Sequence, residues 1–293
     1  MTEQKHDFGT GSVERNIINM AVPMTVAQVL NLLYNLVDRM YIGHIPGASS
    51  LALTGVGITF PVISMITAFA SLYGMGGAPL CSMARGKKDY EKARRIMQDA
   101  FWMLVITGIL LTIVGFLIEK PLLYALGASE VTYPYASSYL KIYLLGNLFV
   151  MIGLGMNPFV NSQGFGTIGM VTVGLGAVIN IVLDPLFIFV FHLGVQGAAT
   201  ATVLSQLASA IWVLLFLTGK KPMLRLSLRW QMPDWNLVRQ IVTLGMANFI
   251  VNFTNSLVQV VCNRQLQVYG GDLYVGVMTV LTSVRDVATM VVH

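Results

Sequence analysis

Long apolar segments separated by short polar connections make up most of the chain. A membrane-spanning helix needs about 20 mainly apolar residues, so each segment is predicted to be one spanning helix. The segments cover about 16–41, 51–80, 97–118, 137–162, 167–191, 195–218 and 237–262, and an eighth begins near 273. The pattern therefore predicts eight transmembrane helices of alternating direction.

The composition supports an all-α integral membrane protein. Of 293 residues, 55% are hydrophobic and only 11% are charged, and the mean hydropathy is +0.71. A soluble domain carries roughly 25% charged residues, so this chain has too few polar groups to cover a soluble globule. The net charge of +5 would suggest nucleic acid as a partner of a soluble protein. Here the surrounding partner is expected to be membrane lipid, and no nucleic acid is expected.

Basic residues concentrate in two of the predicted connections. Residues 85–95 hold six and residues 220–239 hold five of the 18 lysines and arginines. Both connections fall on the same side of an alternating topology, and cytoplasmic loops are enriched in Lys and Arg. We expect the N-terminus and these two connections to be cytoplasmic, in a multi-pass membrane protein.

The segment after the second basic connection resembles a second start of the chain. The first apolar segment carries a polar series that ends at Asp38, and the seventh carries Asn248, Asn252, Asn255 and Gln259. A Gly-containing turn follows each segment. Internal repeats of this kind build many transporters, and the spacing predicts a repeat of roughly 220 residues with six helices.

The repeat predicts four regions along the chain. They are an N-terminal tail at 1–15, a six-helix bundle at 16–219, an interfacial linker at 220–236, and the first two helices of a second, pseudo-symmetric bundle at 237–293. Two six-helix repeats give twelve helices, so we expect this sequence of eight helices to be a piece of a longer protein. The alternative is a natural eight-helix protein.

Two acidic residues, Asp38 and Asp184, lie inside predicted spanning segments at similar depth. An ionised side chain in hydrocarbon costs at least several kcal/mol, and such residues usually face a cavity and have a function. Carboxyl groups in a pocket of low dielectric constant are suited to taking up and releasing protons. The pair is therefore predicted to couple ion movement to a conformational change.

Amide and hydroxyl groups accompany both acids. Gln28, Asn31, Asn35 and Asp38 share one helix face, and Asn180 lies four residues before Asp184. Thr202 and Gln206 lie on one face of the sixth helix at a matching level. We predict an ion-coupling site of Asp38, Asp184, Asn180, Asn35 and Thr202, within a polar cavity that includes Asn31, Gln28 and Gln206. The alternative is that polar side chains only hold helices together.

Other classes of protein fit the sequence poorly. None of the four histidines has metal-ligand spacing, and the membrane carboxylates lack His or Cys partners, so neither a metal site nor an enzyme is expected. A seven-helix receptor does not explain the six-helix repeat. No cofactor is expected. The coupling ion is H⁺ or Na⁺, and Na⁺ would bind at Asp38, Asp184 and Asn180.

Four stretches resemble the multidrug and toxic compound extrusion (MATE) family. Their amino-acid sequences are most similar to its DinF-like, MepA-type bacterial branch. Two stretches correspond to the family's first two helices and two to its fourth and fifth. They are Asn31–Gly43, Ala52–Pro61, Asn157–Gly164 and Gly176–Phe189.

The resemblance implies a V-shaped pair of six-helix bundles that exports cationic amphiphilic compounds in exchange for H⁺ or Na⁺, without a cofactor. It matches Asp38 and Asp184 to the ion-coupling positions, Asn180 and Thr202 to their polar neighbours, and Tyr139 and Asn157 to the surrounding network, and it implies a place in the bacterial inner membrane. Tyr34 is a further candidate for the polar network or cavity. Small organic cations are the expected partners, and a monomer is expected.

One departure from part of the family concerns the seventh helix, which has no acidic residue between Asn236 and Asn263. This departure favours coupling through the first bundle. A lipid-linked precursor flippase or a metabolite exporter on the same fold is the alternative function. A flippase is expected to have a more basic cavity, and the mid-membrane regions hold few bases.

Overall fold

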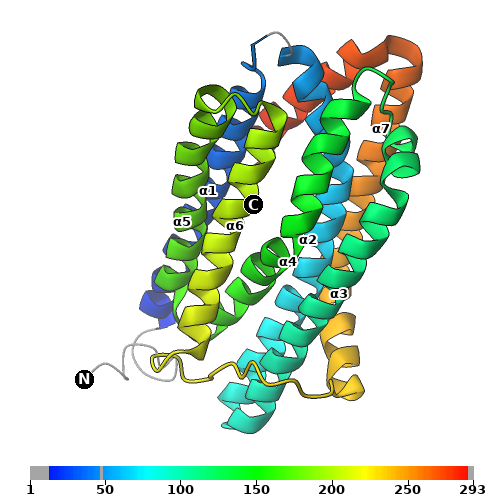
Figure 1. Ribbon diagram of the computed structural model, residues 1–293. Helices are drawn as coiled ribbons and strands as arrows, with labels where there is room; N and C mark the ends of the chain where they lie inside the picture. The colour runs from blue at the N-terminus through cyan, green and yellow to red at the C-terminus, as the bar shows by residue number, and fades with distance from the viewer. Residues whose placement is uncertain (1–12, 47–48, 290–293) are drawn as a thin grey trace.

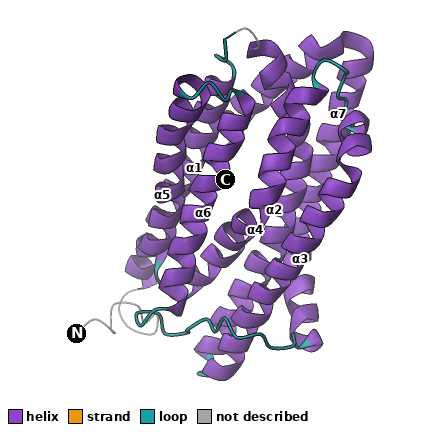
Figure 2. Ribbon diagram, in the orientation of Figure 1, coloured by secondary structure: helices purple, strands orange, loops and turns teal. Residues whose placement is uncertain are grey.

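The computed structural model describes residues 13–46 and 49–289, and every regular element in this part of the chain is helical (Figures 1 and 2). The elements are α1 (Val13–Ile42), α2 (Ser49–Gly86), α3 (Tyr90–Ala125), α4 (Tyr133–Ser162), α5 (Gly166–Pro185), the short π-helix η2 (Leu186–Val190), α6 (Val195–Thr218) and α7 (Trp235–Thr289). Seven helices of the described residues are long and apolar enough to cross a membrane. The predicted all-α membrane fold is confirmed.

The eighth predicted helix is the last part of α7. Gly271 has non-helical backbone angles (φ 67°, ψ −166°) inside α7. A positive φ is readily adopted by glycine, which lacks a Cβ. The chain reverses direction here (Figure 1), so α7 consists of two segments, 235–270 and 272–289, joined at the predicted Gly-containing turn.

Two helices are longer than the hydrophobic pattern predicts. The α2 helix continues to Gly86 and α3 begins at Tyr90, so only residues 87–89 form the turn between them. The side chain of Asp89 caps α3 by accepting a hydrogen bond from the Lys92 backbone N–H (3.1 Å). Basic residues that the sequence assigned to a loop therefore extend as helix ends beyond the apolar region.

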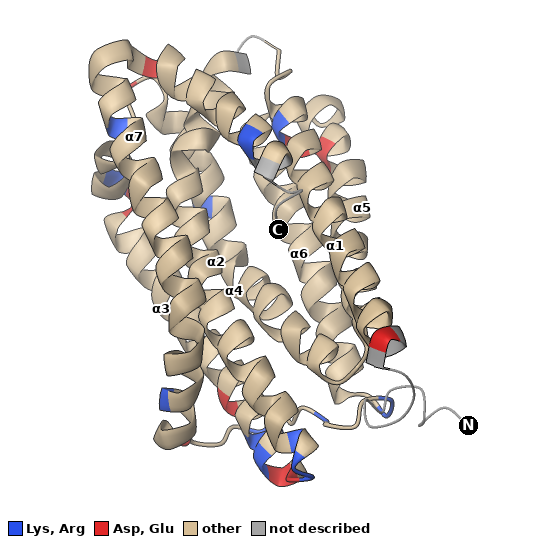
Figure 3. Ribbon diagram, turned by 180° about the vertical axis from the view of Figure 1, so that it is seen from behind, with Lys and Arg blue, Asp and Glu red and all other residues tan. Residues whose placement is uncertain are grey.

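The two basic connections lie at the same end of the molecule, together with the start of α1 (Figures 1 and 3). We call this the basic end, defined by residues 87–89 and 219–234. The linker is held against α3 there: Gln98 donates to the Arg229 carbonyl (3.1 Å), and the Trp102 and Trp230 rings meet edge to face at 4.7 Å.

The α2 helix lies at the centre of the packing. Its interface with α7 is the most extensive of all helix pairs in the described residues. The two backbones approach so closely that a Cβ at Gly76 would overlap the Ile241 carbonyl oxygen, and a Cβ at Gly245 would overlap the Leu72 carbonyl oxygen. By contrast, α1 packs mainly on α5 and barely touches α2. Helix α1 is thus held from one side.

Replacing Gly245 with Ala is expected to destabilise the protein by at least about 1–3 kcal/mol, because backbone atoms that meet the new methyl group cannot rotate away. Gly86→Ala is the matched control, since no atom lies within 4 Å of a Cβ there. Thermal unfolding in detergent, followed by size-exclusion chromatography, measures both. Equal melting temperatures would contradict the α2–α7 contact.

Candidate functional site

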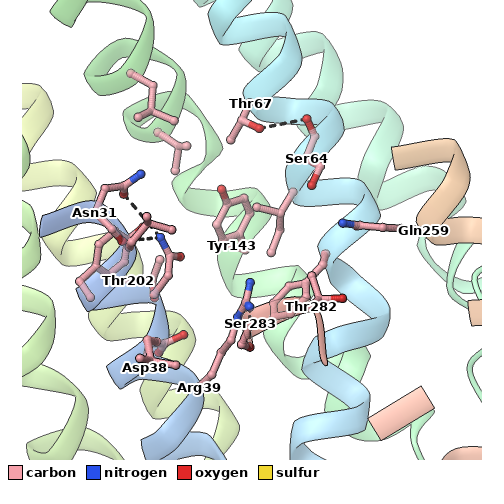
Figure 4. Close-up of a pocket in the computed structure, with 18 of the residues that line it drawn as sticks. Asn31, Asp38, Arg39, Ser64, Thr67, Tyr143, Thr202, Gln259, Thr282 and Ser283 are labelled. Atoms are coloured by element: carbon pink, nitrogen blue, oxygen red, sulfur yellow. Dashed lines mark hydrogen bonds between the residues drawn. The ribbon is translucent and has the colours of Figure 1, made fainter. Parts of the chain in front are cut away.

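A cavity of about 350 Å³ lies between α1, α2, α4, α6 and both segments of α7 (Figure 4). The first bundle contributes most of its polar lining. These residues are Asn31, Tyr34, Asn35, Asp38, Arg39, Ser64, Thr67, Tyr139, Tyr143, Thr202 and Gln206. The α7 wall adds Asn252, Asn255, Gln259, Thr282, Ser283 and Arg285. A volume of this size falls in the range of small-molecule sites.

The carboxyl groups of Asp38 and Asp184 are neighbours that interact electrostatically. Asp38 is on α1 and lines the cavity, with 8% of its surface exposed, whereas Asp184 on α5 is fully buried behind it. The packing of α1 on α5 brings them together. Asp38 and Asp184 therefore lie not only at a similar depth, as the sequence predicted, but also next to each other.

The end of α5 explains where Asp184 lies. Pro185 has no backbone N–H and cannot continue the regular hydrogen-bonding pattern. The helix changes at this residue into the π-helix Leu186–Val190. Single π-turns of this kind often occur at functional sites. Asp184 is thus the last residue before a local break in the helix.

Asn180 links Asp184 to α6. Its amide nitrogen donates to Asp184 Oδ1 (3.3 Å) and lies 3.4 Å from Thr202 Oγ1. Three buried oxygens of the cluster have no hydrogen-bond partner among the described residues: Asp38 Oδ1, Asp184 Oδ2 and Asn180 Oδ1. All are acceptors, and this chemistry suits a proton or a small cation.

Tyrosine and amide side chains extend this cluster into the cavity. Tyr34 lies beside Asn35 and Gln206, and Tyr139 lies beside Thr202. Asn35 donates to the Asn31 carbonyl oxygen at 2.7 Å. The amide of Asn35 is therefore turned along its own helix.

Two residues predicted for the polar cavity, Gln28 and Asn157, lie outside its lining. Gln28 is exposed on α1, closer to the basic end, and Asn157 contacts Gly169 through an amide–carbonyl distance of 3.4 Å between α4 and α5. Residues spaced three and four apart share a face over a few turns only, because 3.6 residues make one turn. The stripe on α1 turns away from the cavity before it reaches Gln28.

Sequence reasoning missed the basic character of one wall. Arg39, in the last turn of α1, and Arg285 both line the cavity. Arg39 donates to Ser283 Oγ (2.6 Å), and its guanidinium carbon lies 4.5 Å from the centre of the Phe60 ring. The sequence feature that could have indicated it is Arg39, which directly follows the membrane residue Asp38.

No group of three or more His, Cys, Asp and Glu side chains in residues 13–46 and 49–289 could hold a metal ion. The two carboxylates with the Asn180 oxygen are the strongest set of oxygen ligands that the cavity offers. A bound Na⁺ would be transported cargo rather than a resident cofactor.

Comparison with known protein families identifies the family of this chain. The sequence profile of the MatE family matches residues 23–186, which contain both aspartates and Asn180. The chain belongs to the MatE family. This family consists of membrane transporters, so the predictions of family, of a multi-pass membrane protein and of a non-enzyme are confirmed.

Individual relatives have names that point to drug export. The multidrug export protein MepA of Staphylococcus saprophyticus is 26% identical over 268 residues, which are 92% of this chain and 59% of the relative. The solved structure of the MATE multidrug transporter DinF-BH, a complex with a ligand, has a TM-score of 0.90 and 31% identity, covering 99% of this chain and 65% of that one.

A third relative is a solved transporter of the MOP superfamily from Pyrococcus furiosus, described as having a binding pocket of reverse polarity that suggests a different function. It has a TM-score of 0.86 and 25% identity, covering 99% of this chain and 64% of that one. The chain thus spans about three fifths of the length of the curated relatives it matches.

The unequal exposure of the two acids predicts unequal reactivity. Dicyclohexylcarbodiimide, an apolar reagent for protonated carboxyl groups, is expected to modify Asp38, which lines the cavity, and to leave Asp184 unmodified. Peptide mass spectrometry locates the adduct. Asp184→Asn is expected to keep the labelling and Asp38→Asn to lose it. Predominant labelling of Asp184 would contradict the arrangement.

Proposed function

We propose that the protein is a secondary antiporter that exports small cationic amphiphilic compounds in exchange for H⁺ or Na⁺, with Asp38 and Asp184 as the coupling site. The observation that carries this proposal is the proximity of the two carboxyl groups, with Asp38 lining the 350 Å³ cavity and Asp184 buried behind it. The names of the MepA and DinF-BH relatives support multidrug export.

Electrostatics links the ion to the exported compound. Two ionised carboxylates in contact repel strongly where the dielectric constant is low, so the pair needs a positive charge close by. A proton, a sodium ion or the cationic group of a drug can supply it. Because the ion and the drug would each neutralise the same two carboxylates, binding of one weakens binding of the other, as exchange requires.

Helix α1 is the element suited to respond to the bound ion. It carries Asp38, it packs mainly on α5, and it contains Pro23. Neutralising Asp38 removes a charge that otherwise demands hydration or a counter-ion. We propose that the resulting change in hydration alters the bend of α1 and so the shape of the cavity.

The three unpartnered oxygens of Asp38, Asp184 and Asn180 suit either ion. A proton would bridge the two carboxyl groups as a hydrogen bond, whereas Na⁺ would draw all three oxygens into one coordination shell. Asn180 therefore serves a sodium site more directly than a proton site. Both ions remain part of the proposal.

A lipid-linked precursor flippase or metabolite exporter on the same fold is the second candidate. Arg39 and Arg285 favour it, since a basic wall suits phosphate-bearing molecules. Two features favour a cationic drug over this candidate: the paired carboxyl groups, and a cavity small for a lipid-linked sugar.

Asp38→Asn and Asp184→Asn are each expected to lower efflux of a fluorescent cation by at least about tenfold, the factor that corresponds to 1.4 kcal/mol. Asparagine keeps the shape but cannot exchange a proton or balance a cation. The control is Glu130→Gln, which changes an exposed acid that does not line the cavity. Undiminished efflux in both aspartate variants would refute the coupling site.

The coupling ion is identified in vesicles that contain the purified protein and a fluorescent cation. A proton gradient imposed without sodium drives uptake if H⁺ is the coupling ion, and a sodium gradient at constant pH drives it if Na⁺ is. Asn180→Leu is expected to abolish sodium-driven uptake more completely than proton-driven uptake. Uptake that neither gradient stimulates would exclude antiport.

We also propose that the basic end faces the cytoplasm of a bacterial cell, that residues 1–15 are a cytoplasmic tail, and that residues 16–219, 220–236 and 237–293 are bundle, linker and second-bundle helices. In a chain with Cys81 and Cys262 replaced by Ala, Glu130→Cys is expected to react with an impermeant maleimide in intact cells. Lys87→Cys is expected to react only after permeabilisation. The reverse pattern would invert the topology.

A further inference from the structure

The linker between α6 and α7, residues 219–234, runs across the ends of several helices at the basic end (Figure 1). The Leu226 N–H donates to the Leu217 carbonyl oxygen near the end of α6 (2.9 Å). The Leu224 N–H donates to Oε1 of Gln163, which follows the last residue of α4 (2.9 Å). The linker backbone is therefore fastened to the ends of α6 and α4.

The linker also lies at the level where the apolar part of α3 begins. Its Trp230 ring meets the Trp102 ring edge to face, with 4.7 Å between the ring centres. Trp102 belongs to the run Ala100–Ile118, which contains no charged residue, whereas the preceding turn of α3 holds the ion pair Arg95–Asp99 (3.3 Å). Because charge-free segments span the hydrocarbon, we expect the boundary between hydrocarbon and lipid headgroups at this level.

Side chains of the linker alternate between the protein interior and the surface. Leu224 and Leu226 are buried, whereas Met223 and Arg225 are exposed. Successive side chains of an extended backbone point to opposite sides, which explains the alternation. One side of the linker is thus packed on the helices, and the other side, which we call the outward side, faces away from them.

The outward side combines basic side chains with large apolar ones. The exposed basic residues are Lys220, Lys221, Arg225 and Arg229, and the exposed large apolar residues are Met223, Leu228, Trp230 and Met232. None of these four basic side chains forms an ion pair within residues 13–46 and 49–289. Tryptophan is enriched at the level of lipid headgroups, and Lys and Arg next to a spanning helix attract anionic lipids.

We propose that the outward side of the linker binds the headgroups of anionic phospholipids in the membrane leaflet next to the basic end. Its four basic side chains contact the negatively charged headgroups, and Trp230 and Met232 lie at the start of the acyl chains. The linker holds one acid, Asp234, whose Oδ1 accepts the Asn236 N–H at the start of α7 (2.9 Å). None of these residues lines the cavity, so the inference is independent of the exported compound.

Two other surroundings compete with lipid for the outward side: water, and another part of the polypeptide. Water leaves Trp230 in contact with solvent, and polypeptide shields it from lipid. Neither brings an acyl chain next to the Trp230 ring, and neither depends on the charge of the headgroup. Contact with lipid and preference for an anionic headgroup therefore distinguish the proposal from both alternatives.

Tryptophan fluorescence measures both properties. The chain has four tryptophans, and replacing three of them with Phe gives one protein that retains Trp230 and another that retains Trp212. Trp212 is the matched control, because it is an exposed residue of α6 outside the linker. Each protein is placed in nanodiscs that mix phosphatidylglycerol, which is anionic, with phosphatidylcholine, which is zwitterionic. One lipid at a time is brominated near the start of its acyl chains, and quenching gives the relative affinity of the two lipids.

Phosphatidylglycerol is expected to be preferred at Trp230 by at least about fivefold, the factor that corresponds to a single basic residue near an anionic surface. The ratio at Trp212 is expected to be about one. Added salt is expected to lower the ratio at Trp230, because ions screen exposed charges. Equal quenching of Trp230 by the two lipids, or no quenching by either, would overturn the proposal.

Replacing the four basic residues of the outward side with Gln is expected to reduce the ratio at Trp230 to about one. The control variant loses the same charge from the α2–α3 hairpin, through Gln at the exposed positions Lys87, Lys88, Lys92 and Arg94, and is expected to keep the preference. Equal loss in both variants would assign the preference to the overall charge of the basic end and refute a linker site. The comparison of Trp230 with Trp212 remains decisive even if the glutamine variants fail to fold.

Discussion

The contact between two carboxyl groups is the constraint on which the site depends. In a medium that solvates charge poorly, Asp38 and Asp184 can lie together only if other groups balance or share their charge. Asn180 donates to Asp184 and approaches Thr202, which ties α5 to α6 at the level of the acids. The break at Pro185 and the packing of α1 on α5 then serve to bring the two acids together.

This constraint divides the molecule into parts with different mechanical roles. Glycine contacts fix α2 to α7, so these helices can shift only together. The α1 helix lacks such contacts and is supported mainly by α5. Figure 1 shows α1, α5 and α6 grouped on one side and α2, α3, α4 and α7 on the other. A change of charge at Asp38 therefore acts on the helix that is least restrained by its neighbours.

The fold and the acids could be predicted from sequence because they follow from local patterns. Apolar runs mark the helices, and acids inside such runs are rare and costly enough to be conspicuous. Spacing alone did not predict how far along α1 the polar residues line the cavity. Gln28 and Asp38 share a helix face by spacing, yet only Asp38 lines the cavity. The Arg39–Ser283 bond was also beyond reach, because it joins residues 244 positions apart.

The placement of Asp38 on α1 and Asp184 on α5 has a consequence for the proposed mechanism. The first segment of α7 offers amides to the cavity and no acid, so the proposed ion site has its oxygen ligands on α1 and α5. The α7 wall can then change its hydrogen-bonding groups without altering the ion site. In the transporter that we propose, recognition of varied compounds is compatible with a fixed coupling site, because different walls of the cavity set the two properties. The α2–α7 glycine contacts would transmit ligand binding on the α7 wall to the first bundle, while Asp38 responds through α1.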